Sequence, residues 1–112
     1  MSQIREATDE ELKSILATEA RNVLIDFWSP WCAPCRTLRP HLRRMAQEYA
    51  SKWRLVEVNA EAEADTAQTF GVRALPTLVF YRDGKESFRF SGTVTVSAIA
   101  EKLNELTPTS AP

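Results

Sequence analysis

From Val23 to Cys35 the chain reads VLIDFWSPWCAPC, an apolar run followed directly by a turn and a pair of cysteines. The run from Val23 to Trp28 is too short for a helix and is interrupted only by Asp26, so it predicts a strand covered on both faces. Beyond the turn, apolar residues recur at helical spacing, namely Leu38, Leu42, Met45, Ala46 and Tyr49. This stretch therefore predicts a central strand that leads into a long helix, with the cysteines at the junction.

The flanking sequence predicts further helices and strands on either side of this unit. Thr8 followed by Glu11 is a capping-box signal for a first helix that starts near Asp9. The other expected elements are a weak strand at 3–7, strands at 54–58, 77–81 and 86–90, a short helix at 65–70 that ends at Gly71, and a last helix at 96–106. The final two strands form a hairpin through Asp83-Gly84. The order predicts an α/β fold with a mixed central β-sheet flanked by helices on both faces.

Length and charge predict a single domain that does not bind nucleic acid or membranes. The 112 residues suit one domain, which we place at residues 1–107, followed by a flexible C-terminal tail at 108–112. A formal net charge of −1 predicts binding neither to nucleic acid nor to anionic lipid. No apolar stretch approaches the roughly 20 residues that span a bilayer, and Met1 to Thr8 lacks the pattern of a secretion signal. We expect a monomer in the cytoplasm, with no membrane association.

The chain has two cysteines, and their spacing favours redox chemistry. Cys32 and Cys35 are three residues apart at the start of a predicted helix, which places both sulfurs on one face. Cys32 lies at the helix N-terminus, where unpaired N–H groups and the helix dipole favour the attacking thiolate. Cys35 lies one turn further in and is expected to resolve the mixed disulfide. Between them, Pro34 suits the first helical turn and stiffens the ring, together with Ala33.

Three other uses of the cysteine pair are weaker. A structural zinc ion needs four ligands, and beyond the cysteines the chain offers only His41, so we expect no metal. Haem attachment requires a histidine directly after the second cysteine, where Arg36 stands instead. A purely structural bridge across so short a loop removes little unfolded-chain entropy. A reversible disulfide between Cys32 and Cys35, without a separate cofactor, remains the favoured interpretation.

Other polar and cyclic residues leave alternatives open. Asp26 interrupts an apolar strand, so burial should raise its pKa, and it is either a satisfied buried acid or a proton acceptor for Cys35. Pro76 opens a strand, and the physics of the X-Pro bond alone favours the trans form. The arginines of the long helix are more typical of a solvated face than of a docking surface for an acidic partner; they are Arg36, Arg39, Arg43 and Arg44.

Several motifs taken together resemble the thioredoxin family over about residues 4–106. They are Asp26-Phe27-Trp28, Trp31-Cys32-Ala33-Pro34-Cys35, Pro40, Val72-Arg73-Ala74-Leu75-Pro76-Thr77, Gly84 and Gly92. Thioredoxin is itself the standard example of an activated Cys-x-x-Cys thiol. The resemblance implies a cis Leu75-Pro76 bond, Asp26 as the proton acceptor, and a substrate groove formed by Trp31, Ala74, Leu75, Pro76 and Gly92.

The resemblance also implies an enzyme class and its partners. It implies a thiol–disulfide oxidoreductase that reduces disulfide-containing target proteins, is recharged by a thioredoxin reductase and so takes part in electron transport and cell redox homeostasis. Two other functions stay open: an oxidant or isomerase, and a binding module that uses the groove without turnover. The chain departs from the family at Ala33 and Ala74, where glycine is frequent, and at Glu57, where many members carry lysine. We expect Glu57 to lie near Asp26 and to repel it.

Overall fold

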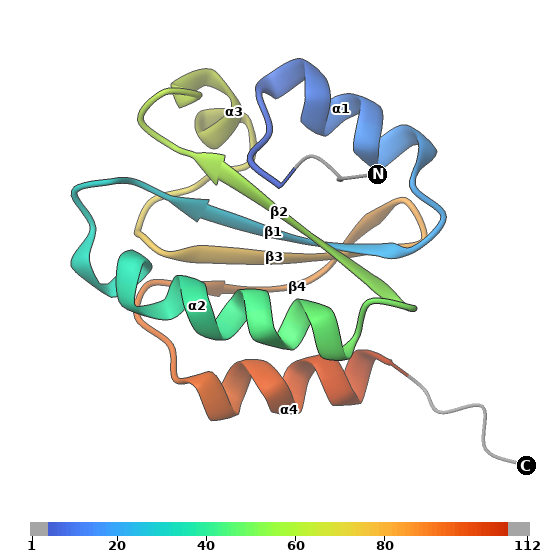
Figure 1. Cartoon of the computed structure of the whole chain (residues 1–112). Coiled ribbons are helices and arrows are strands. Elements are labelled where there is room, and N and C mark those ends of the chain that lie inside the picture. Colours follow the sequence, from blue (N-terminus) through green and yellow to red (C-terminus); the bar gives the residue numbers. More distant parts are fainter. Residues whose placement is uncertain (1–4, 108–112) are drawn as a thin grey trace, which may run out of the picture.

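The computed structural model describes residues 5–107 (Figure 1). Its elements in chain order are α1 (Asp9–Thr18), β1 (Asn22–Trp28), α2 (Ala33–Glu48), β2 (Trp53–Asn59), α3 (Ala64–Thr69), β3 (Thr77–Arg82), β4 (Lys85–Ser91) and α4 (Val96–Leu106). The predicted helices and the strands predicted after residue 20 are confirmed. The start of the predicted domain, residues 1–4, and the predicted tail, residues 108–112, lie outside the described residues.

The strands form one mixed sheet in the order β2-β1-β3-β4. β1 pairs in parallel with β2, and α2 makes the crossover that a parallel connection requires. β1 is antiparallel to β3, which is in turn antiparallel to β4. β1 is therefore an interior strand with a partner on each side, as its apolar sequence predicted.

Helices cover both faces of this sheet (Figure 1). Alternate residues of β1 point to opposite faces, and Val23, Ile25 and Phe27 pack in one apolar cluster with residues of α1 and α3. Leu24 packs in a second cluster with residues of α2 and α4. We call these two sides the α1/α3 face and the α2/α4 face. Asp26 and Trp28 follow Leu24 in the alternation and so belong to the α2/α4 face.

Local sequence signals account for how α1 begins. The Thr8 hydroxyl accepts a hydrogen bond from the Glu11 N–H at 3.3 Å, and the Glu11 carboxylate accepts one from the Thr8 N–H at 2.9 Å. These bonds satisfy two N–H groups that have no partner within the helix. The predicted capping box is confirmed, and α1 starts at Asp9.

The hairpin between β3 and β4 turns through Asp83 and Gly84. Their φ angles are +52° and +81°, the pair of positive values that a two-residue hairpin turn with right-handed strand twist requires. Asparagine, aspartate and glycine tolerate this conformation better than other residues. The Asp-Gly pair thus sets the register next to the turn, and a bulge between Phe80 and Tyr81 shifts the register further along the hairpin.

The candidate strand at the amino end is only partly within the described residues. Glu6 forms an isolated parallel bridge with Glu57, the Ala7 N–H donates to the Glu57 carbonyl at 2.9 Å, and the Glu57 N–H donates to the Arg5 carbonyl at 2.6 Å. This segment therefore adds a short contact to the free edge of β2 rather than a full strand. Among residues 5–107, no helix combines the length and apolar character needed to cross a membrane.

Candidate active site

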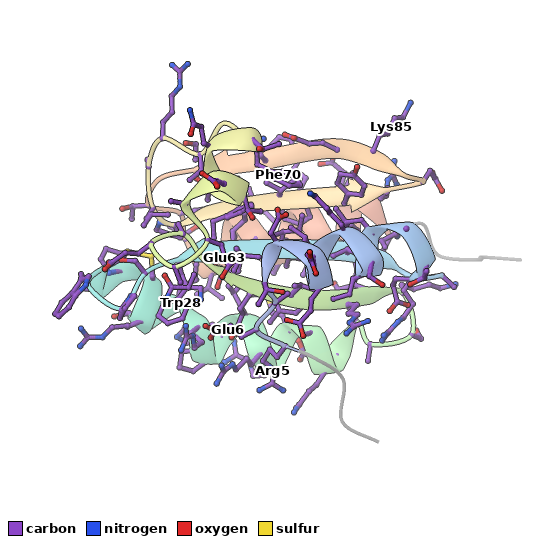
Figure 2. All side chains as sticks on the ribbon, turned by 90° about the horizontal axis from the view of Figure 1, so that it is seen from above. Arg5, Glu6, Trp28, Glu63, Phe70 and Lys85 are labelled. Atoms are coloured by element: carbon purple, nitrogen blue, oxygen red, sulfur yellow. A yellow bond between two sulfur atoms is a disulfide. The ribbon has the colours of Figure 1, made fainter. Side chains whose placement is uncertain are left out.

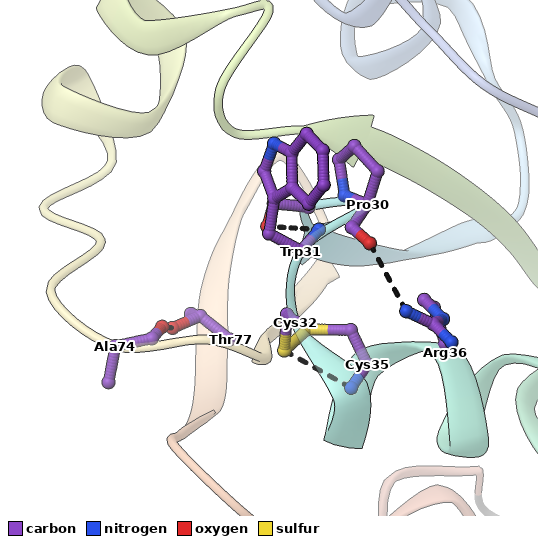
Figure 3. The surroundings of a disulfide bond; sticks show 8 residues. Pro30, Trp31, Cys32, Cys35, Arg36, Ala74 and Thr77 are labelled. Atoms are coloured by element: carbon purple, nitrogen blue, oxygen red, sulfur yellow. Dashed lines mark hydrogen bonds between the residues drawn. A yellow bond between two sulfur atoms is a disulfide. The ribbon is translucent and has the colours of Figure 1, made fainter.

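A disulfide joins Cys32 and Cys35 at the point where β1 gives way to α2 (Figure 3). Their Cα atoms are 5.2 Å apart, within the usual range for a disulfide. Cys32 is the N-cap residue of α2, and its sulfur accepts a hydrogen bond from the Cys35 N–H at 3.2 Å. Pro34 lies in the first helical turn, where its missing N–H costs nothing. The predicted placement of the cysteine pair at a helix start is confirmed.

The two sulfur-bearing residues differ in exposure. Cys32 is half-buried, whereas Cys35 is only 2% exposed and is the first inward-facing residue of α2. An incoming disulfide can therefore reach Cys32 but not Cys35. The helix N-terminus and its N–H groups stabilise negative charge on the Cys32 sulfur when the pair is reduced.

The segment before β3 lies beside the disulfide (Figure 3). The Leu75-Pro76 peptide bond is cis, which confirms what the family resemblance implied and corrects the trans form that the residue types alone favour. The Thr77 hydroxyl donates to the Ala74 carbonyl, and the Gly92 N–H donates to the Pro76 carbonyl at 2.8 Å. The first bond braces the segment before β3, and the second ties that segment to the residue after β4, next to the cysteines.

The surface around the disulfide is apolar and hollowed. Trp31 is 80% exposed and is the large exposed apolar side chain of residues 5–107. On the other side of the turn a groove of about 440 Å³ runs between α2 and the segment that leads into α4. It is lined by Ala33, Pro34, Thr37, Leu38, His41, Pro76, Thr93, Val94, Thr95 and Val96. An exposed tryptophan beside an apolar groove is typical of a surface that binds another molecule.

Asp26 is buried beneath α2 without a hydrogen-bonding partner. Its residue is 1% exposed, and within the described residues neither carboxyl oxygen has a donor. Desolvation by burial, followed by repulsion from Glu57, raises the pKa of Asp26 to about 7, against the opposing charges of Arg39 and Arg43. The predicted direction and both predicted causes are confirmed. At neutral pH this carboxyl group is thus able both to hold and to accept a proton.

Glu57 is the register partner of Asp26 on β2 and is fully buried. Its two carboxylate oxygens accept hydrogen bonds from Nε and Nη2 of Arg43, each at 2.9 Å, and Arg39 Nε lies 3.9 Å from Oε1. The predicted proximity of Glu57 to Asp26 is confirmed. The prediction of a solvated arginine face on α2 is wrong for Arg39 and Arg43, because both turn inward to this buried charge.

The arginine contacts were missed because no local pattern announces them. Arg39 and Arg43 are four residues apart and thus share one side of the helix, and each follows a buried leucine, Leu38 and Leu42. Two signals would have found these contacts. One is the four-residue spacing of the arginines beside the buried leucines, and the other is an acid, Glu57, in an otherwise apolar strand. Trp28 (Figure 2), predicted as a packing residue, is buried. The guanidinium carbon of Arg39 lies 3.7 Å from the centre of its ring.

The described residues contain no cluster of three or more side chains suited to a metal ion. The redox-active group of the site is the Cys32–Cys35 disulfide itself.

Comparisons with known proteins agree with this geometry. The family model for thioredoxin matches residues 3–105. Thioredoxin 1 of Synechococcus elongatus is 33% identical over 105 residues, which cover 94% of this chain and 98% of that protein. The chloroplastic M-type thioredoxin of Pisum sativum is 30% identical, and the match spans 61% of its length. The crystal structure of oxidized mitochondrial thioredoxin 3 from Saccharomyces cerevisiae superposes with a TM-score of 0.81 at 27% identity, covering 91% of this chain and 94% of that one.

Proposed function

This chain belongs to the thioredoxin family, and from that premise we propose how its residues divide the work of the reaction. The protein is a thiol–disulfide oxidoreductase that reduces disulfides in other proteins by exchange through Cys32 and Cys35. One observation carries the division of roles: Cys32 is accessible at the end of α2, whereas Cys35 is buried behind it.

The exchange begins with the reduced pair. The Cys32 thiolate attacks one sulfur of the target disulfide, a mixed disulfide forms, and the other target sulfur leaves as a thiolate. Cys35 then loses its proton and attacks the Cys32 sulfur. The Cys32–Cys35 bond forms as the bond to the target breaks, so two electrons pass from the protein to the target.

Asp26 is the proposed acceptor of the Cys35 proton. Both side chains belong to the layer between the sheet and α2, and both are nearly inaccessible to water. A carboxyl group with a pKa of about 7 is close to the value at which a proton acceptor works best at neutral pH. Burial keeps both side chains from bulk water, so the proposed route for the Cys35 proton is to this internal base.

The target polypeptide is proposed to lie across Trp31 and the segment from Ala74 to Pro76, with Gly92 at its edge. The Gly92 N–H and the Ala74 carbonyl are already engaged within the protein. Leu75 makes no backbone hydrogen bond within residues 5–107, which leaves its peptide groups for pairing with a substrate. Pairing through backbone atoms accepts many target sequences.

Members of this family act with reductases and with disulfide-bearing targets. We infer that a thioredoxin reductase recharges the Cys32–Cys35 pair and that the protein works as a monomer in the cytoplasm, passing electrons onward and holding cellular thiols reduced. The proposed cytoplasmic location rests on how the chain uses cysteine. Both of its cysteines belong to the redox pair, which leaves none for the structural disulfides that are typical of oxidising compartments.

A measured redox potential tests the direction of the reaction. The protein is equilibrated with glutathione buffers of graded ratio, and the oxidised fraction is read from the alkylation of its thiols. A reductant has a potential more negative than the roughly −200 mV of an oxidising compartment. A value above this would favour the oxidant or isomerase function. Failure to reduce a disulfide-bonded test protein in repeated turnovers, with both cysteines intact, would favour a binding module.

A further inference from the structure

Arg39 carries hydrogen-bonding capacity that its surroundings leave unused. Its Nε and Nη2 atoms are buried and have no hydrogen-bond acceptor among the described residues. Its guanidinium carbon lies 3.7 Å from the centre of the Trp28 ring, which places the group over the last residue of β1. Buried donors are normally satisfied, so these two require an explanation.

Glu57 does not need them. Arg43 already donates to both oxygens of Glu57 in a two-pronged arrangement at 2.9 Å, the geometry in which a guanidinium and a carboxylate match best. Arg39 Nε lies 3.9 Å from Glu57 Oε1, which is too long for a hydrogen bond. Arg39 therefore adds positive charge beside Glu57 without completing its hydrogen bonds.

Asp26 lacks hydrogen-bond donors, as Arg39 lacks acceptors. Both of its oxygens are buried without a donor. The charged groups that act on it are Glu57 on β2 and the two arginines of α2, while its partner on β3 is the uncharged Leu78. Arg43 is occupied by Glu57, so Arg39 is the cation on this face with donors to spare. It also rests on Trp28, the next side chain beyond Asp26 on the same face of β1.

We propose that Arg39 is a positioning residue for exchange: it rests on Trp28 while Asp26 is protonated, and its unused N–H groups bind the Asp26 carboxylate once the proton is lost. The consequence for turnover rests on the proposed role of Asp26. Asp26 must be ionised before it can take the Cys35 proton, and Arg39 keeps an ionised fraction available in a buried site. When Asp26 has accepted that proton, Arg39 returns to Trp28.

Titration of Asp26 tests this directly. In oxidised protein labelled with ¹³C at the aspartate carboxyl carbons, the resonance of Asp26 is followed against pH by NMR. We expect Arg39→Gln to raise the titration midpoint by about one pH unit, the lower end of what an adjacent opposite charge contributes. Arg39→Lys, which keeps the charge without the planar donors, should recover part of the change. Arg44→Gln, an exposed arginine of the same helix, should leave the midpoint unchanged. Equal midpoints in wild type and Arg39→Gln would overturn the proposal.

A second pair of variants separates direct contact from an effect through Glu57. In a Glu57→Gln background, Arg39→Gln should still raise the Asp26 midpoint by a similar amount. A midpoint that no longer responds to Arg39 would mean that Glu57 transmits the effect, and direct binding of Asp26 would be refuted.

The rate of target release keeps this inference distinct from the function on which it rests. In single-turnover reduction, Arg39→Gln should slow release of the target from Cys32 about fivefold at pH 7, because about a tenth of Asp26 then remains ionised. The loss should disappear at higher pH. A raised midpoint with an unchanged release rate would support the contact between Arg39 and Asp26 and reject Asp26 as the proton acceptor.

Discussion

The two faces of the central sheet differ in the side chains that β1 places on them. On the α1/α3 face, β1 contributes Val23, Ile25 and Phe27, which are all buried among apolar side chains. On the α2/α4 face the alternate residues begin with Leu24 but continue with Asp26, which has Glu57 beside it. An apolar layer stabilises the fold at any pH, whereas a layer with buried charges makes stability depend on pH. The contrast shows that one face holds the structure and the other also holds the chemistry.

The largest expected effect comes from the cysteine pair at the end of the α2/α4 face. Cys35→Ser should abolish turnover and accumulate mixed disulfides through Cys32, whereas Cys32→Ser should trap almost none, because Cys35 is inaccessible. Non-reducing electrophoresis after incubation with a disulfide-bonded protein measures the trapped complex. The double variant is the control. Equal trapping by the two single variants would remove the assigned roles.

A large-to-small change on the α1/α3 face should cost stability without touching pH dependence. Phe27 is fully buried, so Phe27→Ala should lower the free energy of unfolding by about 3 to 5 kcal/mol. The loss should be the same at pH 5 and pH 8 in urea denaturation. Ile25→Val, a smaller deletion in the same layer, should cost about 0.5 to 1.5 kcal/mol. A loss from Phe27→Ala that changes between the two pH values would break the contrast between the faces.

Removing the buried acid Asp26 should, in contrast, change how stability depends on pH. The folded pKa of Asp26, about 7, lies above the unfolded value of about 3.9. The folded state therefore binds the extra proton, so wild-type stability falls as pH rises from about 4 to about 7, and the penalty is complete above that. Asp26→Ala lacks this penalty, so its free energy of unfolding relative to wild type should rise by about 2 to 4 kcal/mol between pH 4 and pH 8. The cavity that the substitution leaves costs the same at both pH values and does not affect this difference.

The same variant should slow release of the mixed disulfide while the first attack by Cys32 changes less. Denaturation at both pH values and single-turnover reduction measure the two halves. A relative stability that does not change with pH would show that Asp26 is not protonated in the folded protein.

The smallest expected effect concerns the helix end on the α1/α3 side. Thr8→Ala removes one half of the capping box at α1 and should lower the free energy of unfolding by about 1 kcal/mol. The pH profile of disulfide reduction should stay the same, because α1 packs against the face without buried acids. Ser14→Ala, at an exposed position of α1, is the matched control. A shifted pH profile would mean that the two faces are coupled.

Local patterns predicted most of the framework. The capping box at Thr8, the apolar run of β1 and the Asp-Gly hairpin each act over a few residues, and each element formed where its pattern lies. The cysteine pair was equally readable, because its chemistry depends on a spacing of three residues at a helix start. The cis Leu75-Pro76 bond could not be predicted from the residue types, which favour trans, and only the resemblance to a family implied the cis form.

By itself the sequence determined the strands, the helices, the redox pair and the burial of Asp26, since propensity, periodicity and spacing are properties of neighbouring residues. Tertiary structure alone decided which charges meet beneath α2. Glu57 lies beside Asp26 because β1 and β2 pair in one parallel register. Arg39 and Arg43 reach Glu57, and their charges act on Asp26, because α2 crosses that pair of strands. A buried carboxylate needs a cation within a few ångströms, and distances between segments far apart in the chain are set only when the chain is packed.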